Sequence, residues 1–212
     1  MGIKQYLNGL WGKQHSRPGG IMGWLVGEQM VRQHRPETTW TVDLLNIQPT
    51  DTVLEVGFGA GRGIKLAAEK ARNGHIMGID LSETMVRVAT RRNTQAVKAG
   101  QVTLAQGNIL ALPFEDHLFD KIMTIHTFYF WPEPSHALNE LCRVLKPGGT
   151  LVITLSTGRI NAQGEVEVWT PLQSALEEQV IPEMQQAGFK VARLEHGPNS
   201  RQYTSVAVFG EK

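Results

Sequence analysis

The sequence is poor in cysteine, in charge of one sign and in long apolar runs. Its only cysteine, Cys142, cannot form an internal disulfide. Lys and Arg total 21 against 20 Asp and Glu, so the formal net charge of +1 offers no global electrostatic case for a nucleic-acid partner. No stretch approaches the roughly 18–20 uninterrupted apolar residues that span a bilayer, and no signal-peptide core follows Met1. We therefore expect a cytoplasmic protein without a membrane span.

The stretch VLEVGFGAGRG, residues 53–63, predicts a buried strand followed by a loop with a glycine at every second position. Such a loop lets a ligand lie against bare backbone. The third residue after Gly59 is Arg62, which breaks the G-x-G-x-x-G pattern of dinucleotide-binding proteins. Lys65 stands between Ile64 and Leu66, so the Gly-Lys-Ser/Thr end of a Walker loop is also lacking. Neither phosphate-binding loop fits.

From Pro49 onward, short β-like runs alternate with helical patterns, which predicts a parallel sheet covered by helices. Two further β-like runs in the tail, FKVARLEHG and YTSVAVFG, are separated only by PNSRQ, which predicts an antiparallel hairpin. The fold class is thus α/β, a doubly wound seven-stranded sheet that is mostly parallel with a reversed last strand. The first five strands are expected at about 52–56, 75–79, 101–105, 120–125 and 150–155.

The helical patterns of this core lie between the strands, and Ser82 is expected to cap the second of them. They cover 66–74, 82–100 and 135–149.

The first 48 residues contain no convincing strand and predict an N-terminal helical cap. We therefore divide the chain into a cap, 1–48, and a core, 49–212, within one domain overall. The glycine-rich segment SRPGGIMG suggests a mobile flap that folds over bound ligands, with a frayed terminus as the alternative. The two expected helices of the cap are WLVGEQMVRQH and TTWTVDLLNI.

Two acidic residues stand near the ends of the first two strands. Asp80 ends the run HIMGID, where a carboxylate can accept hydrogen bonds from both hydroxyls of a ribose. Glu55 lies in the first strand, and its charge would repel a pyrophosphate but attract an ammonium group. Together with the glycine loop, these acids indicate an adenosine that carries a methionine.

Four stretches in this order, VLEVGFGAGRG, GIDLSETM, QGNILALPFEDHLFD and RVLKPGGTLVI, resemble the class I S-adenosylmethionine-dependent methyltransferases. Within that family, these stretches most resemble the small-molecule branch that includes quinone-ring methyltransferases. The resemblance covers roughly residues 50–155 and implies a Rossmann-like fold, S-adenosylmethionine as cofactor and S-adenosylhomocysteine as product. Where the family commonly has Asp, this chain has Asn108, which keeps a carbonyl acceptor for the adenine. The implied cofactor-binding residues are Glu55, Gly57, Phe58, Gly59, Gly61, Asp80, Leu81, Asn108 and Ile109.

The stretch IHTFYFWPEP, residues 125–134, follows the fourth strand where the acceptor should meet the cofactor. It lacks the Asn/Asp-Pro-Pro-Tyr clamp of enzymes that methylate nucleobase or protein amino groups. We expect His126 as the catalytic base, since its ordinary pKa near 6.5 suits proton removal around neutrality, and Tyr129 as a weaker partner. Tyr129 and Trp131 either wall an apolar acceptor or pack in the core.

The predicted function is transfer of a methyl group to a small, partly apolar acceptor by in-line displacement. The alternatives are an RNA or protein methyltransferase, a non-catalytic S-adenosylmethionine-binding protein and a nicotinamide oxidoreductase. No metal site is expected, because nothing pairs His117 with a second ligand at metal spacing. The expected partner is a small molecule and not a nucleic acid, and a homo-oligomer is compatible with the sequence.

Overall fold

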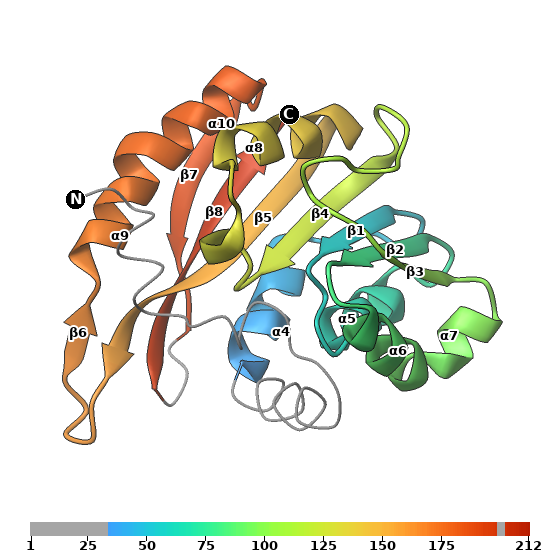
Figure 1. The fold of residues 1–212 in the computed structure, drawn as a ribbon, viewed down its shortest axis with the longest axis horizontal. Coiled ribbons are helices and arrows are strands. Elements are labelled where there is room, and N and C mark those ends of the chain that lie inside the picture. The colour runs from blue at the N-terminus through green and yellow to red at the C-terminus, as the bar shows by residue number, and fades with distance from the viewer. Residues whose placement is uncertain (1–33, 199–201) are drawn as a thin grey trace.

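One mixed sheet forms the middle of the protein (Figure 1). The computed structural model describes residues 34–198 and 202–212. The strand order is β3-β2-β1-β4-β5-β8-β7, with β6 paired to β5 off this path. The strands are β1 (Thr52–Val56), β2 (His75–Asp80), β3 (Val102–Gln106), β4 (Phe119–Ile125), β5 (Leu145–Ile160), β6 (Val166–Val168), β7 (Val191–His196) and β8 (Tyr203–Glu211).

The direction of the strands confirms the predicted fold class. Strands β1 to β5 pair in parallel, whereas β8 runs antiparallel to both of its neighbours, β5 and β7. All seven predicted strands are present. The eighth, β6, pairs for three residues with the far end of β5. Because all three residues of β6 are exposed, the sequence carried no burial pattern that could reveal it.

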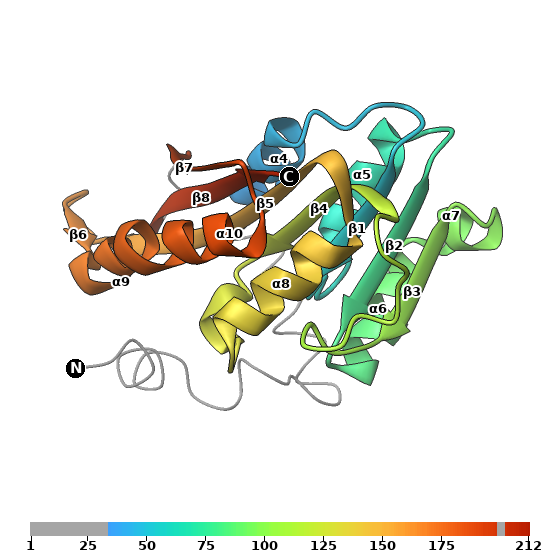
Figure 2. The ribbon, with the colours of Figure 1, turned by 90° about the horizontal axis from the view of Figure 1, so that it is seen from above.

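Alternate residues along each strand serve opposite faces of the sheet. Val53 and Met123 belong to one hydrophobic cluster, whereas Leu54 and Ile122 belong to the other. Helices α4, α5 and α6 cover the first face, and α8 and α10 cover the second, as Figure 2 shows from above. The helices are α4 (Arg35–Leu44), α5 (Arg62–Lys70), α6 (Glu83–Arg92), α7 (Thr94–Lys98), η1 (Phe128–Phe130), α8 (Pro134–Val144), α9 (Thr170–Ala175), η2 (Leu176–Val180) and α10 (Ile181–Ala187).

The helix predicted over 82–100 is interrupted at Asn93, which separates α6 from α7. The Asn93 side chain donates to the carbonyl oxygens of Gly61 and Ala89, at 3.0 and 2.9 Å. It therefore ties the end of α6 to the start of α5. The expected cap is present, because Ser82 Oγ accepts a hydrogen bond from the backbone N–H of Met85.

Helix α4 corresponds to the predicted helix TTWTVDLLNI and packs against β4 and β5. The hydroxyl groups of Thr41 and Thr154 lie 2.7 Å apart and join this helix to β5. The glycine-rich flap, and the helix expected over 24–34 except for His34, lie outside the described residues. No helix of the described part of the chain is long and apolar enough to cross a membrane.

The consecutive helices α9, η2 and α10 were not foreseen from the sequence. Pro171 and Pro182 each stand in the first turn of an α-helix. A backbone N–H at that position has no partner within the helix, so its absence in proline costs nothing. Between the two prolines lies one π-helical turn, η2, which shifts the buried side chains out of the 3.6-residue period. A search for apolar residues at the helical period of 3.6 therefore does not detect these helices.

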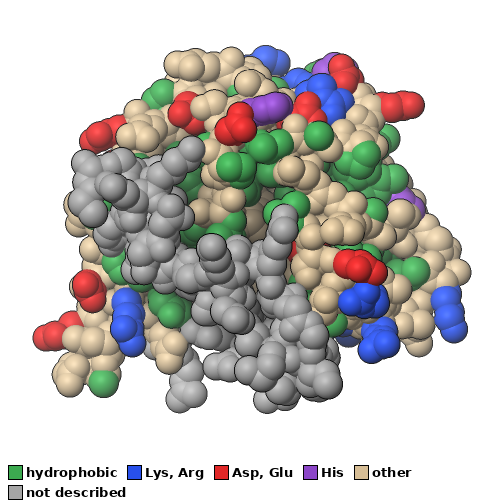
Figure 3. Space-filling model, viewed as in Figure 1, with side chains coloured by type: hydrophobic (Ala, Val, Ile, Leu, Met, Phe, Trp, Pro, Cys, Tyr) green, Lys and Arg blue, Asp and Glu red, His purple; other side chains and the backbone are tan. Residues whose placement is uncertain are grey.

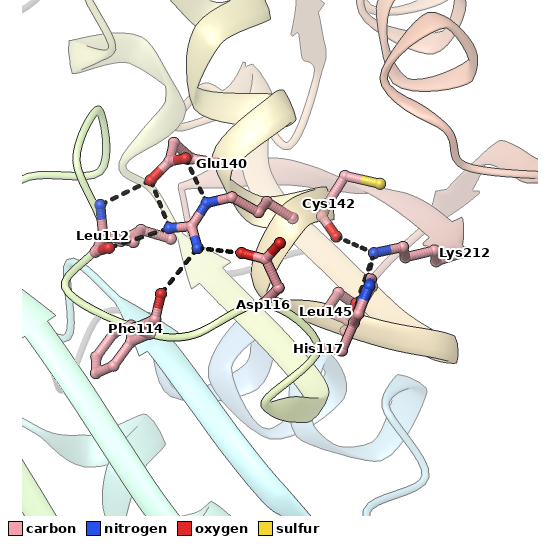
Figure 4. Close-up of polar contacts among 9 residues, drawn as sticks. Leu112, Phe114, Asp116, His117, Glu140, Cys142, Leu145 and Lys212 are labelled. Atoms are coloured by element: carbon pink, nitrogen blue, oxygen red, sulfur yellow. Dashed lines mark hydrogen bonds and ion pairs between the residues drawn. The ribbon is translucent and has the colours of Figure 1, made fainter.

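The loop that leads from β3 to β4 is held by Arg143 of α8 and by a neighbouring contact of Lys212 (Figure 4). The Arg143 guanidinium donates to both carboxylate oxygens of Glu140, to Asp116 and to the carbonyl oxygens of Leu112 and Phe114. These hydrogen bonds raise the pKa of Arg143 and lower that of Glu140. This fork therefore anchors a loop that begins at the carboxyl edge of the sheet.

Exchanging Arg143 for lysine should lower the free energy of unfolding by about 1–2 kcal/mol, because an ammonium cannot reproduce the planar fork. Urea unfolding would measure the change. Arg87 makes an exposed pair with Glu83, and Arg87→Lys should shift stability by less than about 0.5 kcal/mol. Equal losses in the two variants would contradict the anchoring role.

Candidate functional site

A cavity of about 230 Å³ opens at the carboxyl edge of β1, β2 and β4. Figure 3 shows hydrophobic side chains gathered across the middle of the face seen in Figure 1. Eight of the nine predicted cofactor residues line the cavity, the exception being Gly61. His126 also lines it, but Tyr129 does not. Parallel strands bring these residues together, because their carboxyl ends meet at one edge.

The glycine loop between β1 and α5 forms one side of the cavity and passes close to the turn after β4. Gly57 has φ +70°, and a Cβ atom there would lie 2.3 Å from Thr127 Cγ2. Only glycine lets the two loops approach this closely. Gly61 is the N-cap residue of α5 and does not line the cavity. Phe58 lines the cavity, while it is 4% exposed and belongs to the hydrophobic cluster beneath the loop.

Asp80 ties two loops together at the end of β2. One carboxylate oxygen accepts from the Gly59 N–H at 2.9 Å, and the other accepts from the Ser82 N–H at 2.8 Å. Burial raises the pKa of Asp80, whereas these two hydrogen bonds work against that shift. Each oxygen keeps acceptor capacity for a ligand.

Glu55 is 3% exposed and points beneath the start of α5. A Cβ atom on Gly63 would lie 2.4 Å from Glu55 Oε1, so the fourth glycine of the loop makes room for this carboxyl group. The pKa of Glu55 is raised from 4.5 to about 8, chiefly by burial. A hydrogen bond from Ile64 works against the shift, and the charge of Asp80 adds to it. Among the described residues, Glu55 Oε2 has no hydrogen-bond partner.

Leu81, Asn108 and Ile109 line the part of the cavity next to Asp80. Leu81 is 42% exposed, which is high for a large apolar side chain, and Ile109 is 7% exposed. Asn108 Oδ1 accepts a hydrogen bond from the Leu110 N–H at 3.1 Å. A flat apolar group could lie between these side chains.

His126 follows β4 directly and has φ +56°, a conformation uncommon outside glycine. Its backbone N–H donates to the Thr154 carbonyl at 2.8 Å, and its ring lies 4.2 Å from the ring of His34. Burial, with a smaller contribution from His34, lowers the pKa of His126 well below 6.5. Within the part of the chain that the structure describes, the buried Nε2 atom has no hydrogen-bond partner.

Tyr129 faces away from the cavity and supports β5. Its hydroxyl donates to the carbonyl of Ser156 at 2.8 Å and accepts from the Ser156 N–H at 2.6 Å. Burial raises its pKa. The neighbouring Phe130 and Trp131 do line the cavity, so the aromatic stretch divides between wall and core.

Arg62 and His34 line the cavity and were missed as site residues. Arg62 entered the sequence analysis only as the residue that breaks a dinucleotide pattern. Its Nε atom is buried and has no partner among the described residues, and burial with nearby Arg35 and Arg92 lowers its pKa. A cation inside a glycine loop was the available signal for an anionic ligand group. No sequence pattern indicated His34, because its position in the cavity wall depends on how α4 packs against β4 and β5.

The titration of Glu55 should make stability depend on pH. The folded state holds the Glu55 proton more tightly than the unfolded chain, so this group favours folding most at low pH. Its contribution falls by about 1.4 kcal/mol per pH unit between the two pKa values, 4.5 and about 8. Glu55→Gln removes this loss, so the variant should gain stability over the wild type as the pH rises toward 8.

Urea unfolding at a series of pH values would measure this difference. The same exchange at Glu69, which is exposed, is the control for the substitution itself. Parallel stability curves for the wild type and Glu55→Gln would show that the buried carboxyl group does not titrate in this way.

The family model described as a methyltransferase domain matches residues 54–153. An uncharacterized methyltransferase of Bacillus subtilis (strain 168), YdaC, is 30% identical over 166 residues, which cover 78% of this chain and 86% of that protein. A demethylmenaquinone methyltransferase of Bacillus cereus (strain B4264) is 35% identical over 140 residues, which cover 66% of this chain and 57% of the relative's length.

Among solved structures, a SAM-dependent methyltransferase from Aquifex aeolicus superposes with a TM-score of 0.69 at 22% identity. The match covers 87% of this chain and 96% of that one. This likeness shows the fold. The chain belongs to the methyltransferases.

Proposed function

We propose that this methyltransferase acts on a small, partly apolar acceptor that enters the cavity beside His126. One observation carries the proposal. Eight of the nine residues expected to hold the cofactor line the same cavity as the aromatic side chains Phe130 and Trp131. Cofactor and acceptor can therefore share a single enclosed space.

In this proposal the cofactor is S-adenosylmethionine, and it lies along the edge of the sheet. The Asp80 carboxylate accepts hydrogen bonds from the ribose hydroxyls, and the adenine lies between Leu81 and the pair Asn108 and Ile109. The methionine end follows the glycine loop of Gly57, Gly59 and Gly61, with Glu55 near its ammonium group.

We assign the carboxylate of the methionine to Arg62. Its guanidinium group lines the cavity, and its buried Nε has no partner within the described part of the chain. A carboxylate suits the planar donors of arginine. Glu55 and Arg62 then face the two charged groups of the amino-acid tail, and a nearby ammonium group favours the ionised form of Glu55 against the effect of burial.

Methyl transfer needs alignment more than it needs a charged catalyst. An electron pair of the acceptor forms a bond to the methyl carbon while the carbon–sulfur bond breaks. On a reduced quinone ring this pair comes from the π electrons at the ring carbon, which then loses its proton to solvent. The electron pair of the broken carbon–sulfur bond stays on sulfur and leaves S-adenosylhomocysteine. The protein contributes by holding the two atoms in line and excluding water. We keep His126 as the residue that meets the reacting group of the acceptor, and Tyr129 supports it only through β5.

A planar ring of the quinone type is the acceptor that we favour. Phe130, Trp131 and Pro132 give the cavity an apolar wall beside His126. The relatives named demethylmenaquinone methyltransferases match over 66% of this chain, which supports the same class of acceptor.

We further propose that the enzyme works in the cytoplasm and that residues 1–48 cap the core formed by 49–212. Nucleic acid is not its substrate in this proposal. The formal net charge is +1, and on the face in Figure 3 the Lys and Arg side chains are interspersed with Asp and Glu. A homo-oligomer stays a prediction.

Asp80→Ala should weaken S-adenosylmethionine and S-adenosylhomocysteine about 100-fold in calorimetric titrations. The variant loses two charge-assisted hydrogen bonds worth about 1.5–3 kcal/mol each, partly offset by water. Asp120 is the matched control, because it accepts a backbone N–H, from Thr52, at the opposite edge of the sheet. Asp120→Ala should keep its affinity for both ligands. Unchanged affinity in Asp80→Ala, or binding of NADH alone, would overturn the cofactor assignment.

Transfer of radiolabelled methyl groups would test the acceptor. With a reduced naphthoquinone lacking the ring methyl group, we expect label in the organic extract and none in added RNA or protein. Phe130→Ala should lower kcat/KM for the acceptor about tenfold or more with little change in cofactor affinity. Phe114, which is also half-buried but packs against Phe119 away from the cavity, provides the control variant Phe114→Ala. Label in RNA or protein, or equal losses in the two variants, would contradict the proposal.

A further inference from the structure

Three side chains that can bind metals meet beside the cavity, although they are far apart in the sequence. His34 precedes α4, Glu37 lies in the first turn of α4, and His126 follows β4. One ligand atom from each of the three lies within 4.8 Å of the others. His34 and His126 line the cavity, whereas Glu37 is 0% exposed and lies behind them.

The polar atoms of this cluster are poorly paired for their burial. Within the described residues, Glu37 Oε2 and His126 Nε2 are buried without a hydrogen-bond partner. Glu37 Oε1 has only long contacts, 3.4 Å to His34 Nδ1 and 3.5 Å to Ser205 Oγ. Buried carboxylates are normally paired with a charge or coordinate a metal. The cluster therefore calls for a cationic partner.

The spacing suits a single ion better than direct hydrogen bonds. Atoms that bind one Zn²⁺ at about 2.0–2.2 Å lie about 3.3–3.6 Å from one another in a tetrahedral arrangement. The pair His34 Nδ1 and Glu37 Oε1, at 3.4 Å, already has this separation. The remaining separations between ligand atoms, up to 4.8 Å, reach this range when the side-chain ends move by about 1 Å.

The backbone of His126 gives an independent indication. Its φ of +56° is a strained conformation for a residue with a side chain, and such strain is concentrated at functional sites. The hydrogen bond from its N–H to Thr154 holds this conformation. The strained turn presents the imidazole toward His34, whose ring centre is 4.2 Å away.

We propose that His34, Glu37 and His126 bind one divalent transition-metal ion, with a further coordination position open to the cavity. Two imidazoles and one carboxylate are a ligand set that Zn²⁺ and Fe²⁺ accept and that Mg²⁺ and Ca²⁺ do not favour. This inference departs from the sequence analysis, which expected no metal. Only one step rests on the proposed function, namely that the open position takes an oxygen or sulfur atom of the methyl acceptor. His126 then meets the acceptor through the ion.

Zinc binding by the full chain, prepared without a histidine tag and dialysed against a chelator, tests this site. Equilibrium dialysis with elemental analysis should find one Zn²⁺ per chain. Glu37→Gln keeps the shape of the side chain and should weaken binding by at least about tenfold, as should His126→Ala, because loss of even an outer-shell partner costs 10–100-fold. Co²⁺ bound to the wild type should give the intense visible absorption of a four- or five-coordinate ion.

The exposed pair Glu133 and His136 supplies matched controls, because it has the same three-residue spacing as Glu37 and His34, at 3.8 Å. Glu133→Gln and His136→Ala should bind zinc as the wild type does. The proposal is overturned if the wild type binds no more zinc than Glu37→Gln, if the control variants lose binding equally, or if Co²⁺ shows only the weak spectrum of the hydrated ion.

S-adenosylmethionine titration of each variant reports separately on the fold and on the cofactor half of the site. If Glu37→Gln fails to fold, His34→Ala, which removes a half-buried side chain, takes its place. The zinc measurement uses neither cofactor nor acceptor. A failed acceptor assay therefore leaves the metal site standing, and a failed zinc measurement leaves the methyltransferase proposal standing.

Discussion

The cofactor half of the cavity depends on the carboxylate of Asp80. One oxygen accepts the N–H of Gly59 and the other accepts the N–H of Ser82, so a single side chain holds the glycine loop beside the start of α6. Asn93 adds a second link, because its side chain donates to the Gly61 carbonyl of the same loop from the end of α6. Asp80 also lines the cavity. In the proposed function, the group that builds the site is therefore also the group that recognises the ribose.

Buried polar atoms without partners concentrate around this cavity. Within the described residues they are Glu55 Oε2, Arg62 Nε, His126 Nε2 and Glu37 Oε2. Three of these residues line the cavity, and Glu37 adjoins His126. Folded proteins rarely leave such atoms unpaired. An amino-acid tail with two charges and a cation near the acceptor would supply partners to all four, which links the proposed function to the proposed metal site.

The two halves of the cavity differ in how the chain builds them. The proposed cofactor half comes from loops that follow β1, β2 and β3, all of which lie within the residues that the methyltransferase domain matches, 54–153. The proposed acceptor half combines the start of α4, which lies outside the matched residues, with the turn after β4, which lies within them. Acceptor choice therefore depends on the side chains of these two segments and not on the fold.

The sequence by itself determined the parallel sheet, its reversed last strand and most of the residues that line the cavity at the strand ends, because these depend on local patterns. Alternating burial marks the strands, and Gly57, Gly59 and Asp80 lie at strand ends that a parallel sheet must bring together. The tertiary structure decided the rest. It turned Tyr129 into a support for Ser156, assigned Gly63 to the space around Glu55, and brought His34 and Glu37 to His126. No local pattern encodes these contacts, because each depends on how a helix or turn packs against a strand, and the partners of Tyr129 and His126 are distant in the chain.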